Sequence, residues 1–509
     1  MSKYREQLRR AEAEHRRLEQ KIAEACRKSG HARPKTRREF LNQGLIAGVS
    51  TVFLPSLATL LSRNAHAQDA ACVIDGGGAG LGAGKIPFLG IDQGGGANIA
   101  GSNIMVGGVG GQEDFLDAAG YAKLGLPNAI IPQTVGVDRS FGIAMHPNSA
   151  LLRGMLDKTS AATRANVNGV IIPARSENDT DENPHNPIYG IARAGASGEF
   201  AATIGTRNSD SGGRSVAPDS MVVDALRPVR VREASDAVGL GGGANEEGFP
   251  NGRVAEASAI LSALKLGKIT EQQATKDLVQ CGFDKTTATF NTVVTPDDLN
   301  PNLDTNLQAI FPNGELDDGN FEKAAAAMKV VINGYAGAGT IEYGGRDYHQ
   351  DPRPETDGKD FVVGQVIGAA LEYAALQTQP LMLYLFSDGA VAADRNLQED
   401  DGNGTTKFRW RSDNSQTAAS AILVYSPNGQ PVLRGDATAT NQLGNFDNEG
   451  NVVTSSSPFA NSVTALAEMV VLNYMGLHGE QANFGTVLNN PGIGTGAAVD
   501  PFIAFDPIV

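Results

Sequence analysis

Acidic residues lie next to several short apolar segments of this sequence, and one histidine accompanies them. The residues concerned are Asp92, Asp347, His349, Asp388 and Asp413. Each lies beside the end of a segment that has the length and composition of a β-strand. In open α/β sheets, ligands bind outside the carboxyl ends of the strands. We therefore predict that these five side chains meet at one rim of a sheet.

Carboxylate oxygens and imidazole nitrogens are ligands for divalent ions such as zinc, manganese and calcium. A bent loop would aim Asp347 and His349 at one ion, and Asp92, Asp388 and Asp413 would complete one or two sites. Such a site activates water or holds an oxygen of a phosphoryl or sulfuryl group. The alternative is that each aspartate only caps a turn or a helix after its strand.

Strand-like and helix-like segments alternate along the chain, as they do in βαβ units. The expected strands are 85–92, 167–173, 339–343, 380–386 and 419–425, and the expected helices are 149–157, 254–278, 321–336, 362–376 and 462–474. The Asp- and Asn-rich segments 176–186, 396–404 and 445–451 are expected to be solvated loops. We predict an α/β fold with a mostly parallel central sheet flanked by helices and a helical insertion around residues 200–330.

The first 67 residues have the features of an export leader. Arg37 and Arg38 precede Phe40 and a weakly apolar segment, which ends in the small-residue motif 65–67. This pattern predicts a twin-arginine signal over 36–67, preceded by a charged helical extension over 1–35. Residues 68–509 would form the exported domain, in the periplasm or outside the cell. The export machinery would be a partner through the arginine pair, and an uncleaved membrane anchor is the alternative.

The charge of the chain limits its partners. The net charge of the whole chain is −15. The leader has a net charge of +8, so the rest of the chain has a net charge of −23. Such an acidic domain repels nucleic acid and anionic membranes and attracts divalent cations. Of the three cysteines, Cys72 and Cys281 remain after the leader. They can form one disulfide, although their separation in sequence does not establish it.

Several short motifs resemble those of an uncharacterised family of exported bacterial proteins that is similar to alkaline phosphatases and sulfatases. They are the twin-arginine leader, the stretch 92–95 after the first strand, Met145-His146-Pro147 before a helix, the block 344–349 and the stretch 386–389. The resemblance covers roughly residues 85–480. It implies an alkaline phosphatase-like fold and metal-dependent hydrolysis of phosphoric or sulfuric esters, with Ser176 as the nucleophile and His185 as a substrate contact.

The sequence also departs from the pattern of that family. Arg346 occupies a position where tryptophan is usual, and the segment 413–415 lacks the family's histidine. A lost imidazole removes one metal ligand, and such losses lower metal affinity or activity by orders of magnitude. Two functions are therefore considered: a metal-dependent hydrolase, and a non-catalytic exported binding or cell-envelope protein that retains the fold.

Overall fold

A computed structural model describes residues 84–177, 183–241, 296–349 and 351–509. The chain divides into two units, 1–54 and 55–509, and only parts of the second unit are described. The predicted leader, the three cysteines and the expected helix 254–278 lie outside the described residues.

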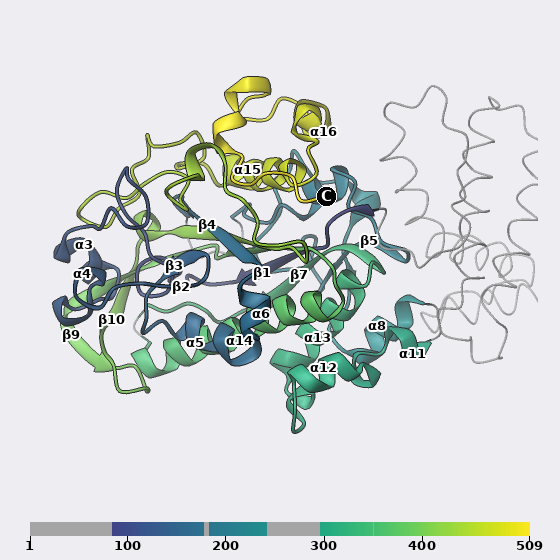
Figure 1. Cartoon of the computed structure of the whole chain (residues 1–509), viewed down its shortest axis with the longest axis horizontal. Helices are drawn as coiled ribbons and strands as arrows, with labels where there is room; N and C mark the ends of the chain where they lie inside the picture. The colour runs from purple at the N-terminus through teal and green to yellow at the C-terminus, as the bar shows by residue number, and fades with distance from the viewer. Residues whose placement is uncertain (1–83, 178–182, 242–295, 350) are drawn as a thin grey trace, which may run out of the picture. The chain divides into compact units, whose positions relative to one another are not determined.

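A mixed sheet of seven strands forms the centre of the described unit (Figure 1). In spatial order its strands are β4 (Val167–Pro173), β11 (Ala419–Tyr425), β8 (Leu381–Phe386), β1 (Phe88–Gln93), β7 (Ala336–Tyr343), β5 (Ala201–Gly205) and β6 (Val229–Arg230). All adjacent pairs are parallel except those of β11, which is antiparallel to both β8 and β4. Six strands therefore run in one direction and β11 runs in the other.

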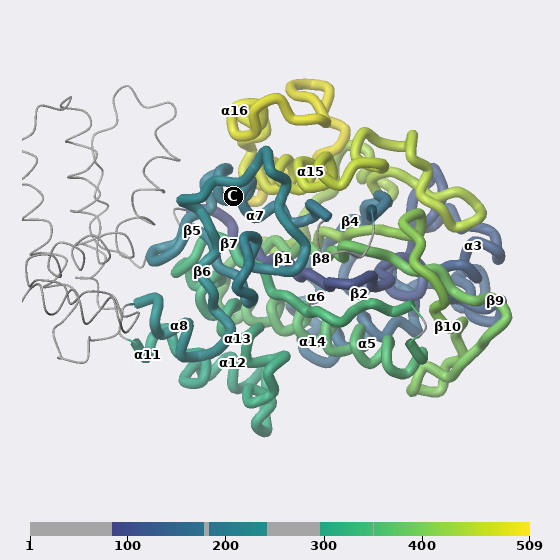
Figure 2. The backbone as a smooth tube through the Cα atoms, turned by 180° about the vertical axis from the view of Figure 1, so that it is seen from behind, coloured from purple at the N-terminus to yellow at the C-terminus, as the bar shows by residue number. Residues whose placement is uncertain are grey.

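Helices cover both faces of this sheet (Figures 1 and 2). The helices are α3 (Ala118–Lys123), α4 (Pro132–Val135), α5 (Ala150–Lys158), α6 (Ala161–Arg164), α7 (Ile188–Arg193), α8 (Ala234–Leu240), α11 (Pro296–Leu299), α12 (Thr305–Ile310), α13 (Gly319–Ile332), α14 (Arg353–Leu376), α15 (Val463–Gly476) and α16 (Phe484–Val487). Leu89 and Ile91 face a core shared with α5, α13 and α14, whereas Phe88 faces a core shared with α7 and α15. Burial on both faces explains why the central strands are continuously apolar.

The α/β class and the mostly parallel sheet expected from the sequence are confirmed. The expected strand 167–173 has the same bounds as β4, and the expected helix 149–157 is α5, which begins after the N-cap Ser149. Helix α14 begins at Arg353, nine residues before the expected start. The sequence did not indicate these first turns because their buried residues are charged, such as Arg353 and Asp357, and do not form an apolar pattern.

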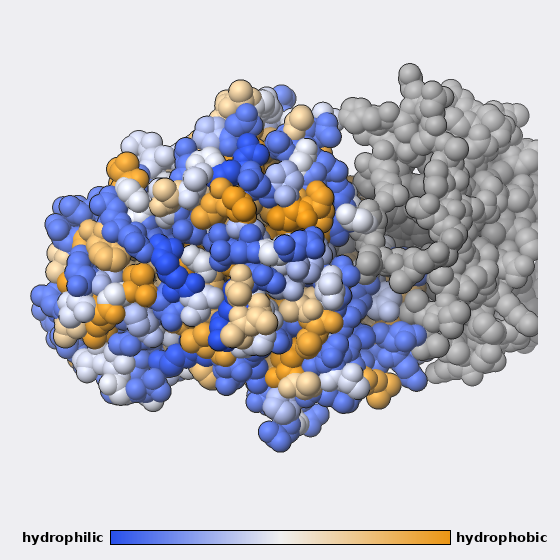
Figure 3. Space-filling model, in the orientation of Figure 1, coloured by the Kyte–Doolittle hydropathy of each residue, from blue (hydrophilic) through white to orange (hydrophobic). Residues whose placement is uncertain are grey.

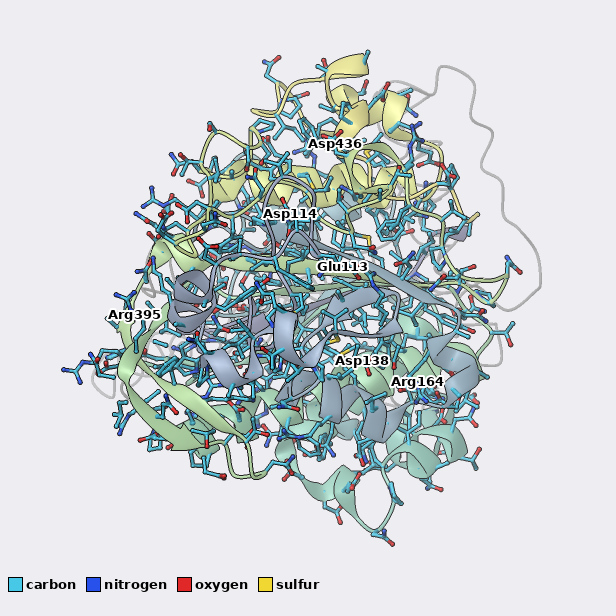
Figure 4. The ribbon with its side chains drawn as sticks, turned by 60° about the vertical axis from the view of Figure 1, so that its left-hand side comes forward. Glu113, Asp114, Asp138, Arg164, Arg395 and Asp436 are labelled. Carbon is cyan, nitrogen blue, oxygen red and sulfur yellow. The ribbon has the colours of Figure 1, made fainter. Side chains whose placement is uncertain are left out.

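Two short hairpins lie outside the central sheet. One pairs β2 (Asp138–Phe141) with β3 (Ile143–Met145), and the other pairs β9 (Val391–Asp400) with β10 (Thr406–Asp413). The second replaces the expected loop 396–404, because the turn between its strands is supplied by Gly402 and Gly404, both at positive φ. Figure 4 shows Arg395 on the outer edge of this β9–β10 hairpin.

On the face drawn in Figure 3, apolar residues are interspersed with hydrophilic ones. Among the described residues, no helix has both the length and the apolar composition needed to cross a membrane.

Glycines allow α5 and α14 to pack at very short distance. A Cβ at Gly154 would lie 2.1 Å from the carbonyl oxygen of Phe361, and one at Gly364 would lie 2.1 Å from that of Leu151. Real Cβ atoms do not approach backbone atoms so closely, so the contact between these helices requires glycine at both positions.

We expect Gly364→Ala to destabilise the protein by about 1–3 kcal/mol, because the added methyl group forces the two helices apart. Gly358→Ala in the same helix is the matched control, since a Cβ there meets no atom within 4 Å. This control should be neutral or stabilising by up to ~1 kcal/mol, because alanine is the better helix former. Urea unfolding measures both changes, and equal stabilities of the two variants would contradict the close packing.

Candidate metal centre

The carboxyl edge of the central sheet carries the predicted site residues. Asp92 is in register with Glu342 of β7 and Phe386 of β8, so the loops that follow these two strands start beside the end of β1. Strand β11 runs in the opposite direction, so the segment that precedes it, including Asp413, reaches the same edge.

Three glycines after β1 connect these loops. The carbonyl oxygen of Gly94 accepts a hydrogen bond from the Arg346 amide at 3.0 Å, and the Gly95 amide donates to Oδ1 of Asp388 at 2.6 Å. Gly95 has a φ of 128°, and a Cβ on it would lie 2.6 Å from the amide nitrogen of Asp347. Only glycine permits this conformation and this approach. The Gly94–Gly96 loop therefore fixes the start of the Asp347 segment against the Asp388 segment.

Asp347, His349 and Asp413 bring one ligand atom each into a group whose atoms all lie within 4.8 Å of one another. We call these three residues the metal triad. His349 Nδ1 contacts Oδ1 of Asp347 and lies 3.4 Å from Oδ1 of Asp413. No other group of three or more such side chains occurs within the described ranges.

The metal triad fits a divalent cation by the chemistry of its donors. Two carboxylates and one imidazole match the oxygen and nitrogen ligands of zinc and manganese sites, and three protein ligands leave positions open for water or substrate. The side chains are 41% (Asp347), 35% (His349) and 54% (Asp413) exposed, so an ion could enter from solvent. Because carboxylate and imidazole ligands bind a metal only when deprotonated, binding at this site would depend on pH.

Asp92 and Asp388 do not belong to the metal triad, so the predicted set of five ligands divides in two. Both residues are buried. Asp92 Oδ2 accepts from the amides of Arg214 at 2.8 Å and Ser215 at 2.9 Å, and Oδ1 accepts from the Ser215 hydroxyl at 2.8 Å. Asp92 thus holds the loop after β5 through hydrogen bonds. Its position in the sequence did not indicate this structural role.

Burial, and after it the neighbouring charge of Asp388, raise the pKa of Asp92 to about 7, although its hydrogen bonds with Arg214 and Ser215 act in the opposite direction. Transfer of a carboxylate from water to the interior disfavours the charged form. Asp92 therefore changes between its protonated and its charged form near neutral pH, whereas an aspartate in solution does so at about pH 4.

Ser176 and His185, expected as nucleophile and substrate contact, are also buried and lie outside the metal triad. Among the residues that the structure describes, none forms a hydrogen bond with the hydroxyl of Ser176 or with either ring nitrogen of His185. Burial lowers the pKa of His185 to about 4, so its ring is neutral at pH 7. The adjacent Asn183 donates to the carbonyl oxygen of Asp388, so this segment does reach the edge of the sheet.

Two arginines near the edge were not singled out by the sequence. Arg175 donates from Nη2 to the Ser415 hydroxyl at 3.0 Å, two residues after Asp413. Arg214 lies against Gly94, where a Cβ would come within 2.1 Å of its Cδ, and its Nε is 3.5 Å from Oε1 of Glu342. No local motif marks either arginine, because only the fold brings their loops to the metal triad's edge.

We expect Asp92 to make stability depend on pH. Its pKa in the folded protein, about 7, is above the ordinary value of 3.8. The folded state therefore binds the proton more tightly, and the free energy of unfolding decreases as pH rises from about 4 to 7. Asp92→Asn keeps an oxygen acceptor for the 214–215 loop but has no proton to lose. Urea unfolding between pH 4 and 8 should show a smaller decrease for this variant, and parallel profiles would contradict the assignment.

No protein-family model matches this chain, and the curated proteins compared with it include no significant match. The geometry at the carboxyl edge, with the metal triad beside the Gly94–Gly96 loop, is therefore the basis for assigning a function.

Proposed function

We propose that this protein is an exported, metal-dependent hydrolase of phosphoric or sulfuric esters with an alkaline phosphatase-like fold. The observation that supports this proposal is the convergence of Asp347, His349 and Asp413 at the carboxyl edge of a mostly parallel sheet. Asp347 and His349 come from the loop after β7, and Asp413 is the last residue of β10, before β11. Ligand sites of α/β proteins occupy this edge of the sheet.

The metal triad would hold zinc, manganese or calcium through two carboxylate oxygens and one imidazole nitrogen. A divalent ion bound there supplies positive charge that polarises an ester oxygen and activates a nucleophile. His349 would bind the ion through an unprotonated ring nitrogen, and Asp347 and Asp413 would bind it as carboxylates. Both carboxylates remain accessible, so substrate could approach from solvent.

Arg175 and Arg214 favour an anionic ester as the substrate. Each is partly exposed and lies on a loop that contacts the segments of the metal triad. Guanidinium groups bind the oxygens of phosphate and sulfate through paired hydrogen bonds. In a chain with so many acids, these two cations would offset the repulsion of an anion at the site.

The leader supports export, with Arg37 and Arg38 as the residues that the twin-arginine machinery would recognise. We propose a periplasmic or extracellular location for the domain that follows. Determination of the amino terminus of the protein recovered from the periplasm tests this, and Gln68 as the first residue is the expected result. An intact terminus on a membrane-bound protein would favour the anchor instead.

We expect the purified full chain to bind one divalent ion. After removal of metal with a chelator, titration with Zn²⁺, Mn²⁺ or Ca²⁺ in a calorimeter should show one site per chain. Asp347→Ala and His349→Ala each remove a ligand and should weaken the affinity at least about 100-fold. Asp436→Ala removes an exposed acid elsewhere (Figure 4) and should leave the affinity unchanged. A folded protein that binds none of these ions would favour the non-catalytic exported protein.

We also expect the metal-loaded protein to hydrolyse a simple aryl phosphate or aryl sulfate. His349→Ala should lower kcat/KM by a factor of about 100 or more, because the ion that stabilises the transition state is lost. Ser176→Ala distinguishes the expected nucleophile from a buried serine without a catalytic role. Loss of turnover with retained metal binding would identify the nucleophile, whereas full turnover would remove Ser176 from the mechanism.

A further inference from the structure

The metal triad is assembled from two segments that are about 64 residues apart, and a shared support must hold them together. Tyr348, between Asp347 and His349, provides the first part of that support. Its side chain is fully buried, whereas its two neighbours are exposed by 41% and 35%. The loop thus alternates between two ligands that face solvent and one aromatic ring that faces the interior.

Tyr348 packs in a small apolar cluster with Ala97, Val391 and Trp410. Val391 is the register partner of Asp413 in the β9–β10 hairpin, and Trp410 lies three residues before Asp413 on β10. One cluster therefore joins the loop that carries two ligands to the hairpin that carries the third. Ala97 extends the cluster to the segment directly after the Gly94–Gly96 loop.

Hydrogen bonds connect this cluster to helix α14. The Tyr348 hydroxyl donates to Oδ1 of Asp360 at 2.7 Å, and Oδ2 of Asp360 accepts from Asn103 at 2.8 Å. Asp360 is itself buried. A buried carboxylate must be satisfied by hydrogen bonds, so the position of the tyrosine hydroxyl is fixed by its acceptor.

The hairpin is held to the same helix by buried ions. The guanidinium of Arg353 lies 4.5 Å from the Trp410 ring, and its Nη2 is 2.8 Å from Oδ1 of Asp357. Lys407 on β10 contacts Asp357 and lies 3.1 Å from Oδ2 of Asp401. Arg353, Asp357 and Asp360 share one face of α14, since their spacings are four and three residues.

Buried ion pairs are expensive to desolvate and give little net stability, so their value lies in the geometry that they impose. Here they join β10, which ends in Asp413, to α14. We propose that Tyr348, Trp410, Asp360 and the Arg353–Asp357–Lys407 ion network are positioning residues that preorganise the metal triad. This inference rests on the proposed function, because it concerns the same metal centre.

Tyr348→Phe tests the inference, since it removes only the hydroxyl and keeps the ring in the cluster. We expect the affinity for Mn²⁺ or Zn²⁺, titrated into the chelator-treated full chain, to fall by about 10–100-fold, the usual effect of losing a partner that orients a ligand. The matched control is Tyr474→Phe on α15. Tyr474 is also fully buried and donates one hydrogen bond, to the carbonyl oxygen of Ile86 at 2.8 Å. The control should lose stability and keep the wild-type affinity.

Trp410→Phe provides a second variant on the other segment. It keeps an aromatic ring and loses part of the contact with Arg353, so we expect a weaker affinity in the same direction. Wild-type affinity in both Tyr348→Phe and Trp410→Phe would overturn the positioning role and leave the metal centre intact. A wild-type protein that binds no ion would overturn the proposed function itself, and this inference with it.

Discussion

The close approach of the Gly94–Gly96 backbone to two neighbouring loops is the constraint on which the candidate site depends. The amide of Gly95 reaches the Asp388 carboxylate, and its Cα lies where a side chain would collide with the amide of Asp347. A larger residue would separate the loops after β7 and β8. Because parallel strands deliver their loops to one edge, a single permissive turn at the central strand can set the spacing of several functional segments.

The buried network on α14 answers a second requirement of the site. Asp347 and His349 are partly exposed, and such side chains lose conformational entropy when they are held in one geometry. Residues in the interior join the two segments that carry the metal triad. Tyr348 and Trp410 place the two segments against one helix. The cost of burying Lys407 and Arg353 is offset within the network by Asp357 and Asp401.

The sequence predicted the parts of the fold whose signals are local. The strand 167–173 and the helix 149–157 follow from continuous apolar runs and a serine N-cap, and such features do not need distant partners. The β9–β10 hairpin was missed because its outer half is polar, and its pairing depends on glycine turns and on ions buried against α14. The early start of α14 was missed for the same reason.

The sequence also predicted the edge of the sheet at which the candidate site lies, because that signal is local as well. A strand that ends in an acid indicates an edge, and Asp347, His349 and Asp413 do meet there. The sequence did not distinguish these ligands from Asp92, because burial and the hydrogen bonds from the 214–215 loop are properties of the assembled structure. Ser176 and His185, which only the family resemblance implied, are buried and lie outside the metal triad.

The reversed direction of β11 has a consequence for how this molecule tolerates change. Because β11 is antiparallel to β8, the segment before β11, and not one after it, lies at the carboxyl edge of the sheet. Asp413 in this segment is therefore connected to the β9–β10 hairpin rather than to a crossover helix. The tip at 401–404 lies at the other end of the ribbon from Asp413, and its Asp401 is buried beside Lys407. Insertions there would leave the order and the register of the central strands unchanged but would disturb the contact of Asp401 with Lys407, so a change at this distant turn would be felt at Asp413.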